Sequence, residues 1–519
     1  MPRSVMQHDF SRNPSIDAPR SKFDLSHGHK TTFNAGYLVP FYVEDVLPGD
    51  TFNLRTEGFA RMATQLFPVM DNMFMDTHFF FVPLRLVWDN ARKFFGEQVD
   101  PADSIDFTLP VFNEFTPTES SLSDYLGLPP VACTPVSVYH RGYNLVWNHW
   151  FRDQNLQDSR VVDTDDGPDD IINYSLRRRG KRHDYFTSAL PWPQKGDAVT
   201  LPNPTLLPIK STGDAIDLAR TTSSGEKNVM RGTASSSTIE ATNIWGTTAS
   251  LTFSTAGDAN TGLEVDFDNA TLDTINDLRE AFQIQKLLER DARGGTRYAE
   301  LVANHFGVNF YDVAYRPEFL GGGSTMININ PVAATSAASG TSVGELGAFA
   351  TSHVRGHGFT KSFVEHGFIL GLVSVRADLT YQQGIHRRFL KSTRYDIYWP
   401  SLAHLGEQAI TNAEIYYQNT TADDNVFGYQ ERYAEYRYHP SRISGAFRSS
   451  AATPLDSWHL SQEFSTLPLL NNIFIEENPP MSRVIAASNE PDFIFDSYIH
   501  ISAARPMPVF GIPGMIDHF

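Results

Sequence analysis

The sequence of 519 residues contains one cysteine, Cys133, so no disulfide bond can form within the chain. This excludes a disulfide-stabilised scaffold and favours a reducing compartment. The sequence also lacks an apolar signal-peptide core near its N-terminus, and no stretch approaches the roughly 18 apolar residues that a membrane span needs. We therefore expect a soluble protein that is made in the cytoplasm.

Positive charge is scarce. The chain has 42 Lys and Arg residues against 60 Asp and Glu residues, which gives a formal net charge of −18. Each contact with a nucleic-acid phosphate needs a Lys or Arg, and carboxylates repel the phosphate backbone. A protein that coats nucleic acid with its whole surface is therefore excluded, and any nucleic-acid contact must be local.

Aromatic residues, glycine and proline are abundant by contrast. The chain contains 37 Phe, 35 Gly and 31 Pro, a composition typical of many short strands joined by turns. Alternating or continuous apolar residues predict strands at 37–45, 73–81, 368–375 and 493–501. We therefore expect a large, mainly β protein, whose length suggests two to four domains.

One segment, 271–323, shows sustained helical periodicity, because its apolar residues recur at three- and four-residue steps. Thr274 and Asp277 are placed to cap its first helix, and a Gly-Gly pair at 294–295 ends that helix. A second, short helix is expected to end at Gly307. Two other helices are predicted, one from Pro83 to Gly96 and one through Tyr143, Val146, Trp147 and Trp150.

The region 195–270 is poor in aromatic residues. Between Trp192 and Phe267 only Trp245 and Phe253 occur, and Ser, Thr, Ala and Gly take the place of the others. Such a region cannot contribute much to the main core, and a flexible linker is one interpretation. The segments ASLTFS and LEVDF favour another interpretation, a small β-rich subdomain inserted into the chain and projecting from its surface.

The densest positive cluster lies just after a run rich in aspartate, DTDDGPDD at 163–170. Aromatic residues flank the cluster and offer stacking platforms for bases. A solvated loop, or ion pairs with the nearby aspartates, is the alternative interpretation. The cluster consists of Arg177, Arg178, Arg179, Lys181 and Arg182, flanked by Tyr174, Tyr185 and Phe186.

Other motifs lack the context that their chemistry needs. The aspartate run matches a calcium loop poorly, because Gly167 stands one place early and Asn173 replaces the required Glu. The G-x-S-x-G pattern at 340–344 has no strand and helix around its serine, and His353 and His357 lie among glycines. We predict no catalytic residue, no metal site and no cofactor. A second basic patch, interpreted as a subunit contact or a solvent-facing loop, consists of His386, Arg387, Arg388, Lys391 and Arg394.

Longer motifs point to one family. The run LREAFQIQKLLERDARGGTRYAE, followed by RPEFLGGG, resembles the major capsid protein of gokushoviruses, small tailless single-stranded DNA phages of the Microviridae. Further motifs match in the family's order and cover nearly the whole chain outside about 195–270. They are MDTHFFFVPLRLVWDNARKF, GFTKSFVEHGFILGLVSVRADLTYQQG, YWPSLAHLGEQAI, FGYQERYAEYRYHPSRISGAFRS, LDSWHL and RPMPVFGIPGMIDHF.

The resemblance implies a fold and a role. The fold is an eight-stranded antiparallel viral jelly roll with long loop insertions, including helices and a surface subdomain. Copies are expected to assemble in the bacterial host cytoplasm into a virion, a T=1 icosahedral shell of sixty subunits around circular single-stranded DNA. The basic cluster is then predicted to bind that DNA. Implied partners are an internal scaffolding protein, a small basic DNA-binding protein, a DNA pilot protein and an unknown host-surface receptor, without membrane insertion.

The same resemblance divides the chain into five parts. The predicted parts are 1–32, an N-terminal arm on the inner face of the shell, with a frayed terminus as the alternative; 33–194, the first part of the jelly roll with loop excursions; 195–270, an outer protrusion at the threefold axes, used in host attachment; 271–323, the helical segment; and 324–519, the second part of the jelly roll with a C-terminal extension.

Two other classes of protein remain open at this point. A carbohydrate-active β-sandwich enzyme would also be aromatic-rich and acidic, and would need two carboxylates about 5 to 9.5 Å apart in a cleft. A carbohydrate-binding surface protein would explain the polar insertion but not the phage-like motifs. Electron microscopy discriminates among these classes, because only a capsid protein forms particles of uniform diameter.

Overall fold

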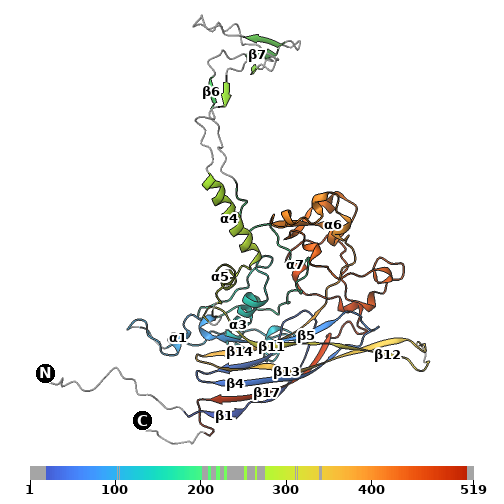
Figure 1. Cartoon of the computed structure of the whole chain (residues 1–519). Helices are drawn as coiled ribbons and strands as arrows, with labels where there is room; N and C mark the ends of the chain where they lie inside the picture. The colour runs from blue at the N-terminus through green and yellow to red at the C-terminus, as the bar shows by residue number, and fades with distance from the viewer. Residues whose placement is uncertain are drawn as a thin grey trace, which may run out of the picture. The chain divides into compact units, whose positions relative to one another are not determined.

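The computed structural model of the protein describes residues 19–101, 103, 106–200, 209–211, 218–221, 227–230, 251–253, 263–265, 275–309, 311, 314–337, 340 and 342–510. The chain divides into two compact units, the first being Met1–Pro193 with Asp291–Phe519 and the second Gln194–Arg290. Figure 1 labels their elements. None of the described helices is long and apolar enough to cross a membrane.

Strands dominate the first unit, where the described residues form two larger antiparallel sheets and a two-stranded antiparallel sheet. Their bounds are β1 (Ser21–Asp24), β2 (His27–Phe33), β3 (Val39–Val46), β4 (Thr51–Met62), β5 (Met73–Pro83), β11 (Glu318–Met326), β12 (Asn328–Ala333), β13 (Leu346–Ser362), β14 (Gly367–Ala377), β15 (Glu407–Thr411), β16 (Val426–Glu431) and β17 (Phe493–Arg505).

The order of these strands identifies a jelly roll. Sheet one has the order β2-β17-β4-β13, extended by β1 along the same edge of β17 and by β12 beyond β13. Sheet two has the order β3-β14-β5-β11. The strands β2, β3, β4, β5, β11, β13, β14 and β17 are therefore distributed between the sheets in the pattern of two Greek keys. The predicted eight-stranded antiparallel jelly roll is confirmed.

The two sheets enclose one aromatic core. On β17, buried and exposed residues alternate, so that Phe493, Phe495 and Ile499 point inward as their spacing predicts. The ring of Phe41 on β3 lies 6.0 Å from the ring of Phe495 and 5.7 Å from that of Phe79 on β5, which joins the two sheets. Each such ring stabilises the fold by about 1.5 to 3 kcal/mol through burial.

The other face of sheet two is covered by helical segments of the first unit, as Figure 1 shows for α3. A second core lies there, and Gly142 of α3 leaves space for the ring of Phe368 on β14, where an added Cβ would collide. Both faces of β14 are therefore buried. The apolar run 368–375 predicts a fully buried strand, and this prediction is confirmed.

The helices of the first unit are short. The α-helices are α1 (Ala91–Phe94), α2 (Leu122–Tyr125), α3 (Val138–Val146), α5 (Tyr298–Phe306), α6 (Asn412–Ile415) and α7 (Asn472–Ile475), and a π turn (Trp147–Phe151) continues α3. The 3-10 helices are Leu84–Leu86, Ile171–Asn173, Arg387–Phe389, Arg394–Asp396, Pro400–Leu402, Thr421–Asp424, Ala434–Tyr436, Gly445–Phe447, Asp456–Trp458 and Met481–Arg483.

The helix predicted from Pro83 to Gly96 is broken into a 3-10 turn and α1. The break occurs because Trp88 and Asn90 both donate side-chain hydrogen bonds to Asp166, which holds the intervening backbone away from a continuous helix. Gly96, with φ of 97°, ends α1.

Part of the predicted N-terminal arm belongs to the jelly roll. Residues 21–33 form β1 and β2, which pair with β17, and Phe33 is buried against Phe493 and Phe495. Edge pairing satisfies the backbone of this polar segment although few of its side chains are apolar. Residues 1–18 of the predicted arm lie outside the described residues.

The second unit contains short antiparallel strands and most of a long helix. β6 (Ile209–Ser211) pairs with β10 (Leu263–Val265), and β7 (Leu218–Thr221) pairs with β8 (Lys227–Met230) and β9 (Leu251–Phe253). The strands predicted in ASLTFS and LEVDF are β9 and β10. The predicted long helix is α4 (Ile275–Arg293), whose expected cap, Thr274, lies outside the described residues.

Candidate nucleic-acid interface

The predicted basic cluster lies on a segment that is hydrogen-bonded on both sides like a strand. The backbone N–H groups of Leu38 and Arg179 donate to the carbonyl groups of Arg177 and Gly36 on one side. On the other side, the backbone N–H group of Lys181 donates to the carbonyl group of Ile475, and the N–H group of Glu477 donates to the carbonyl group of Arg179. The backbone fixes the side chains of the cluster in alternating directions, toward different parts of the first unit.

Arg179 points inward. Its Nη1 atom lies 2.6 Å from Asp76 Oδ2 and 2.9 Å from Ser374 Oγ, and Arg376 donates to the same carboxylate at 2.8 Å. Burial, together with the charge of Arg376, lowers the pKa of Arg179 to about 10, so the guanidinium stays charged at neutral pH. Burial alone would raise the pKa of Asp76, but Arg179, Ser324 and Arg376 together outweigh burial, and the pKa lies below its ordinary value.

Lys181 is also buried, with 6% of its surface exposed. Its Nζ atom donates to Gln462 Oε1 at 2.8 Å and lies 4.5 Å from the centre of the Phe474 ring. Burial lowers the pKa of Lys181 to about 8 and raises the pKa of Glu477, whose charge partly offsets the loss of solvation of the lysine. The amino group of Lys181 therefore lies in the interior of the first unit and does not face solvent.

The remaining cations of the cluster are partly accessible. Arg178 stacks on the ring of Tyr37 at 4.2 Å and donates to the carbonyl group of Glu477 at 2.9 Å. Arg182 stacks on Phe74 at 4.1 Å and pairs with Asp378 at 3.3 Å. Arg177 is half-buried, and burial lowers its pKa.

The aspartates at 163–170 have different partners from those that the sequence suggests. Asp169 and Asp165 accept hydrogen bonds from Arg141 of α3, Asp166 from Trp88, and Asp163 from Tyr174. Among the described residues no group of three His, Cys, Asp or Glu side chains is placed to hold a metal ion. The acidic loop anchors α3 rather than neutralising the basic cluster.

The second basic patch divides in the same way. Arg387 donates to Glu414 at 2.8 Å, and Lys391 lies 3.0 Å from Glu435. Arg388 and Arg394 are exposed. Arg387 and Lys391 therefore stabilise the insertion between β14 and β17, whereas Arg388 and Arg394 face solvent.

Comparison with known proteins decides the family. Residues 11–515 match the family described as capsid protein (F protein). The chain belongs to this phage capsid protein family. Capsid protein VP1 of Bdellovibrio phage phiMH2K is 44% identical over 529 aligned positions, which cover 99% of this chain and 98% of the relative.

Two other relatives agree. Capsid protein VP1 of Chlamydia phage 1 is 42% identical over 590 positions, covering 99% of this chain and 98% of the relative. Capsid protein VP1 of Spiroplasma virus 4 is 33% identical over 545 positions, covering 98% and 97%. The role of a capsid protein is structural, its copies associate into a shell, and it is part of the virion.

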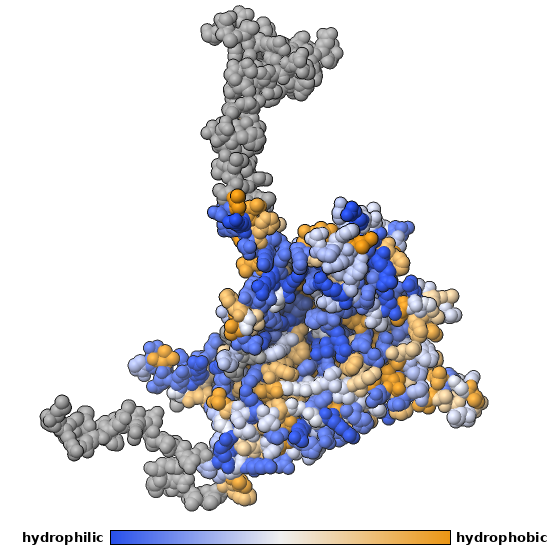
Figure 2. Space-filling view, viewed as in Figure 1, coloured by the Kyte–Doolittle hydropathy of each residue, from blue (hydrophilic) through white to orange (hydrophobic). Residues whose placement is uncertain are grey.

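The surface of this capsid protein carries many apolar side chains. Figure 2 shows hydrophobic residues at the surface of the first unit among hydrophilic ones. Phe389, Tyr395 and Trp399 are 76%, 59% and 43% exposed, whereas Phe94 packs within the subunit, its ring 5.2 Å from that of Trp88. The exposed aromatic side chains offer apolar area for contacts between copies.

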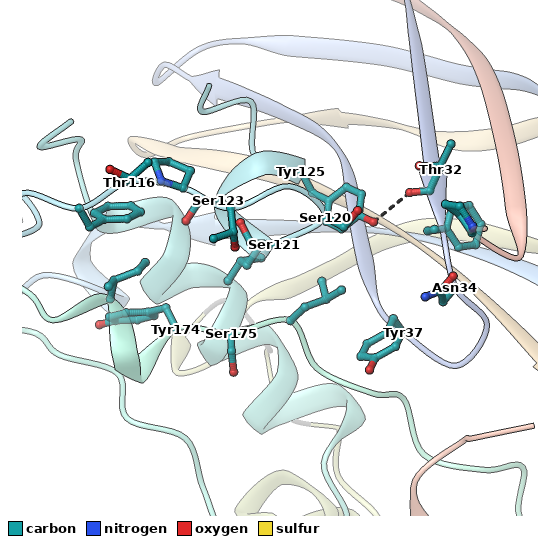
Figure 3. A pocket seen from close by; sticks show the side chains of 18 residues that line it. Thr32, Asn34, Tyr37, Thr116, Ser120, Ser121, Ser123, Tyr125, Tyr174 and Ser175 are labelled. Carbon is teal, nitrogen blue, oxygen red and sulfur yellow. Dashed lines mark hydrogen bonds between the residues drawn. The ribbon is translucent and has the colours of Figure 1, made fainter. Parts of the chain in front are cut away.

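Figure 3 shows a pocket of about 580 Å³ lined by hydroxyl groups and aromatic rings. Tyr125 donates to the carbonyl group of Thr32 at 2.9 Å across it, and Ser123 is held by His140 at 2.8 Å. None of the described residues that line this pocket is charged. It therefore lacks the pair of carboxylates that a glycoside hydrolase needs.

One group of exposed residues lies on β4, a strand that is not predicted from the sequence. Arg55, Phe59 and Arg61 alternate on β4 with the buried side chains of Phe52 and Leu54. The alternation is the signal that predicts a strand with one solvent face, but Thr56 and Gly58 interrupt the inward apolar series.

Proposed function

We propose that this capsid protein forms a T=1 icosahedral shell of sixty copies that encloses circular single-stranded DNA. The observation that carries the proposal is a complete jelly roll whose long insertions leave large aromatic side chains exposed on a single subunit. A monomer in solution rarely leaves such side chains uncovered, and closed symmetry covers the same contacts on every copy.

The resemblance to gokushoviruses supports a genome of circular single-stranded DNA. The motifs shared with gokushoviruses favour this kind of genome. The relatives that match over nearly their full length are capsid proteins VP1 of two phages and a virus. Assembly in the bacterial host cytoplasm, with a scaffolding protein, a small basic DNA-binding protein and a DNA pilot protein, follows from the same resemblance.

The second unit is proposed to be the outer protrusion at the threefold axes and the site of host attachment. It is a compact unit of its own, and its region 195–270 is polar and poor in aromatic residues. A region that adds little to the main core is free to vary with the receptor. The division of the chain into five parts is likewise a proposal, with the parts 1–32, 33–194, 195–270, 271–323 and 324–519.

DNA contact by the basic cluster also remains a proposal. Support is weakest at Lys181, which is buried, and at Arg179, whose side chain is 13% exposed and bonded to Asp76, and stronger at Arg177, Arg178 and Arg182, which are partly accessible. At most these three side chains can reach phosphates without unfolding the segment that carries them.

Nuclease digestion tests the proposed genome. Particles are purified from host cells, treated with nuclease to remove external nucleic acid, and disrupted. The proposal predicts a protected DNA that a single-strand-specific nuclease degrades and an exonuclease does not, because the strand is circular. Protected double-stranded DNA, protected RNA or empty particles alone would refute the proposed genome.

A further inference from the structure

The solvent face of sheet one is a regular surface of the first unit, on which every second residue of β4 and β17 is exposed. In Figure 1 the helices α1, α3 and α5 lie on the side of sheet two, and β17 and β4 lie on the other side. We call the solvent-facing residues of β1, β2, β17, β4 and β13 the sheet-one face.

The register of the strands places specific side chains together on the sheet-one face. Phe59 of β4 lies opposite Asp496 of β17 and His353 of β13. One pair further along, Glu57 lies opposite Tyr498 and Arg355. In the other direction, Arg61 lies opposite Ile494 and Thr351. Aromatic and charged side chains are therefore interleaved.

Cations outnumber carboxylates on this face of a chain that is strongly acidic overall. Within the described part of the chain, Arg55, Arg61 and Arg355 are exposed and have no ion-pair or hydrogen-bond partner, in contrast to Arg179 and Lys181. The cations of the sheet-one face are Lys22, Lys30, Arg55, Arg61 and Arg355, and its carboxylates are Asp24, Glu57 and Asp496.

Two of the three carboxylates have a partner. Asp496 lies 3.2 Å from Lys30, whereas Glu57 has, among the described residues, only His500 near it, at 3.8 Å. Asp24 accepts a hydrogen bond from the backbone of Ser26 at 3.0 Å. Arg55, Arg61 and Arg355 can therefore each form a new charge-assisted hydrogen bond with an anionic ligand.

Two aromatic pairs stand between these arginines. The ring of Phe59 lies 5.0 Å from the ring of His353, and the ring of Tyr498 lies 4.6 Å from the ring of His500. Phe59 and Tyr498 remain 42% and 47% exposed. They are diagonal neighbours on adjacent strands, which places them about 7 to 8 Å apart. Two rings at this spacing, flanked by cations, fit consecutive bases of an unpaired strand.

We propose that the sheet-one face binds the packaged single-stranded DNA, with Arg55, Arg61 and Arg355 contacting phosphates and Phe59 and Tyr498 stacking on bases. The inference rests on the proposed function, in which the shell encloses single-stranded DNA. Charge argues against the other occupants. A small basic protein would be repelled by the free arginines, and so would the same face of a second copy in a two-fold contact.

Salt dependence of DNA binding tests the arginines. Full-length subunits carrying Arg55→Gln, Arg61→Gln and Arg355→Gln are titrated into a fluorescent oligodeoxythymidylate at several salt concentrations. Loss of three contacts should make the slope of log affinity against log salt shallower by about 2, from about 0.7 per contact. Replacing the same arginines by lysine should restore the slope.

The matched control removes the same charge elsewhere. Arg388, Arg442 and Arg448 are exposed side chains of the insertion between β14 and β17. Their triple replacement by glutamine should leave the slope unchanged. If this control flattens the slope as much as the sheet-one variant does, binding follows net charge and the proposal is wrong.

The aromatic residues have a separate signature. Phe59→Ala and Tyr498→Ala should each weaken binding about fivefold or more without changing the salt slope, whereas Tyr498→Phe should bind like the wild type. Equal affinity of the alanine variants and the wild type would overturn the stacking contacts. Thermal unfolding of every variant confirms that the jelly roll is intact.

Ultraviolet cross-linking of wild-type particles distinguishes this inference from the proposed function. Nucleotide adducts are expected on peptides from 51–62 and 493–505. Particles that contain single-stranded DNA but cross-link it only through other segments, such as 174–186, would overturn the inference and leave the proposed function standing. Particles without single-stranded DNA would overturn both.

Discussion

Arg141 of α3 donates two hydrogen bonds to the carboxylate of Asp169, and neither side chain reaches solvent. The Nε atom lies 2.7 Å from Oδ2, Nη2 bonds Oδ1, and the side chains are 0% and 1% exposed. Arg141 also donates to the carbonyl groups of Val87 and Asp165. One guanidinium therefore joins the helix that covers sheet two to the acidic loop.

Breaking this pair should destabilise the first unit. Arg141→Met leaves the Asp169 carboxylate buried without its cation, which should cost about 3 to 5 kcal/mol in the free energy of unfolding. Urea unfolding of the full chain measures it. Asp165→Asn is the control, because the side chain of Asp165 is 77% exposed and its replacement should change stability by less than about 1 kcal/mol. Equal effects of the two replacements would contradict this account.

Buried histidines should make stability depend on pH. His140 is 2% exposed, lies 2.8 Å from Ser123, and faces the rings of Phe112 and Tyr174. Burial lowers its pKa to about 3, although Asp169 acts in the opposite direction. His140 becomes protonated near pH 6.5 in the unfolded chain but stays neutral in the folded chain until about pH 3. The free energy of unfolding therefore falls as the pH falls from about 6.5 toward 3.

The loss attributable to His140 should be roughly 2 kcal/mol at pH 5 relative to neutral pH. Urea unfolding of the wild type and of His140→Gln at pH 7 and pH 5 measures it. The Gln variant should lose less stability on acidification by about that amount. An identical pH dependence in the two proteins would show that His140 is protonated in the folded state or does not contribute.

Exposed aromatic residues of the insertion between β14 and β17 should support assembly rather than folding. Phe389→Ser combined with Trp399→Ser removes two exposed rings, and burial of each at an interface is worth about 1.5 to 3 kcal/mol. Sedimentation velocity should show fewer closed particles and more free subunits. The unfolding midpoint of the subunit should stay within a few degrees of the wild type. Normal particle yield would place these rings outside the interfaces.

Deleting residues 205–260 should spare the jelly roll and abolish adsorption to host cells. The deleted residues belong to the second compact unit, and shortening a loop changes its closure entropy by less than about 1 kcal/mol per halving. Particle yield and cell binding are measured separately. Normal infectivity would refute the attachment role. Insoluble protein would show that the second unit supports the fold.

Some of the strands were predictable from the sequence, whereas others, such as β4 and β13, were not. The alternation around Phe493 and Phe495 and the apolar run 368–375 required only local residues, because burial on one face or on both faces sets the pattern. β4 was missed because Thr56 and Gly58 stand at inward positions, and with it the exposed series from Arg55 to Arg61.

The partners of the basic cluster were not predictable, because they lie far away in the sequence. Arg179 binds Asp76 and Ser374, which are 103 and 195 residues away, and Arg178 binds the carbonyl group of Glu477, 299 residues away. The aspartates that lie close in sequence pair with Arg141 instead. The sequence shows where cationic residues are concentrated. It does not show which of them have a partner within the subunit.

The most direct test of the account is electron cryomicroscopy of particles purified from infected cells. The account predicts closed shells of a single diameter with T=1 icosahedral symmetry, in which each of sixty copies shows sheets ordered β2-β17-β4-β13 and β3-β14-β5-β11. Density for nucleic acid should lie against the sheet-one face. A protein that is found only as monomers or open aggregates in those cells would contradict the central claim.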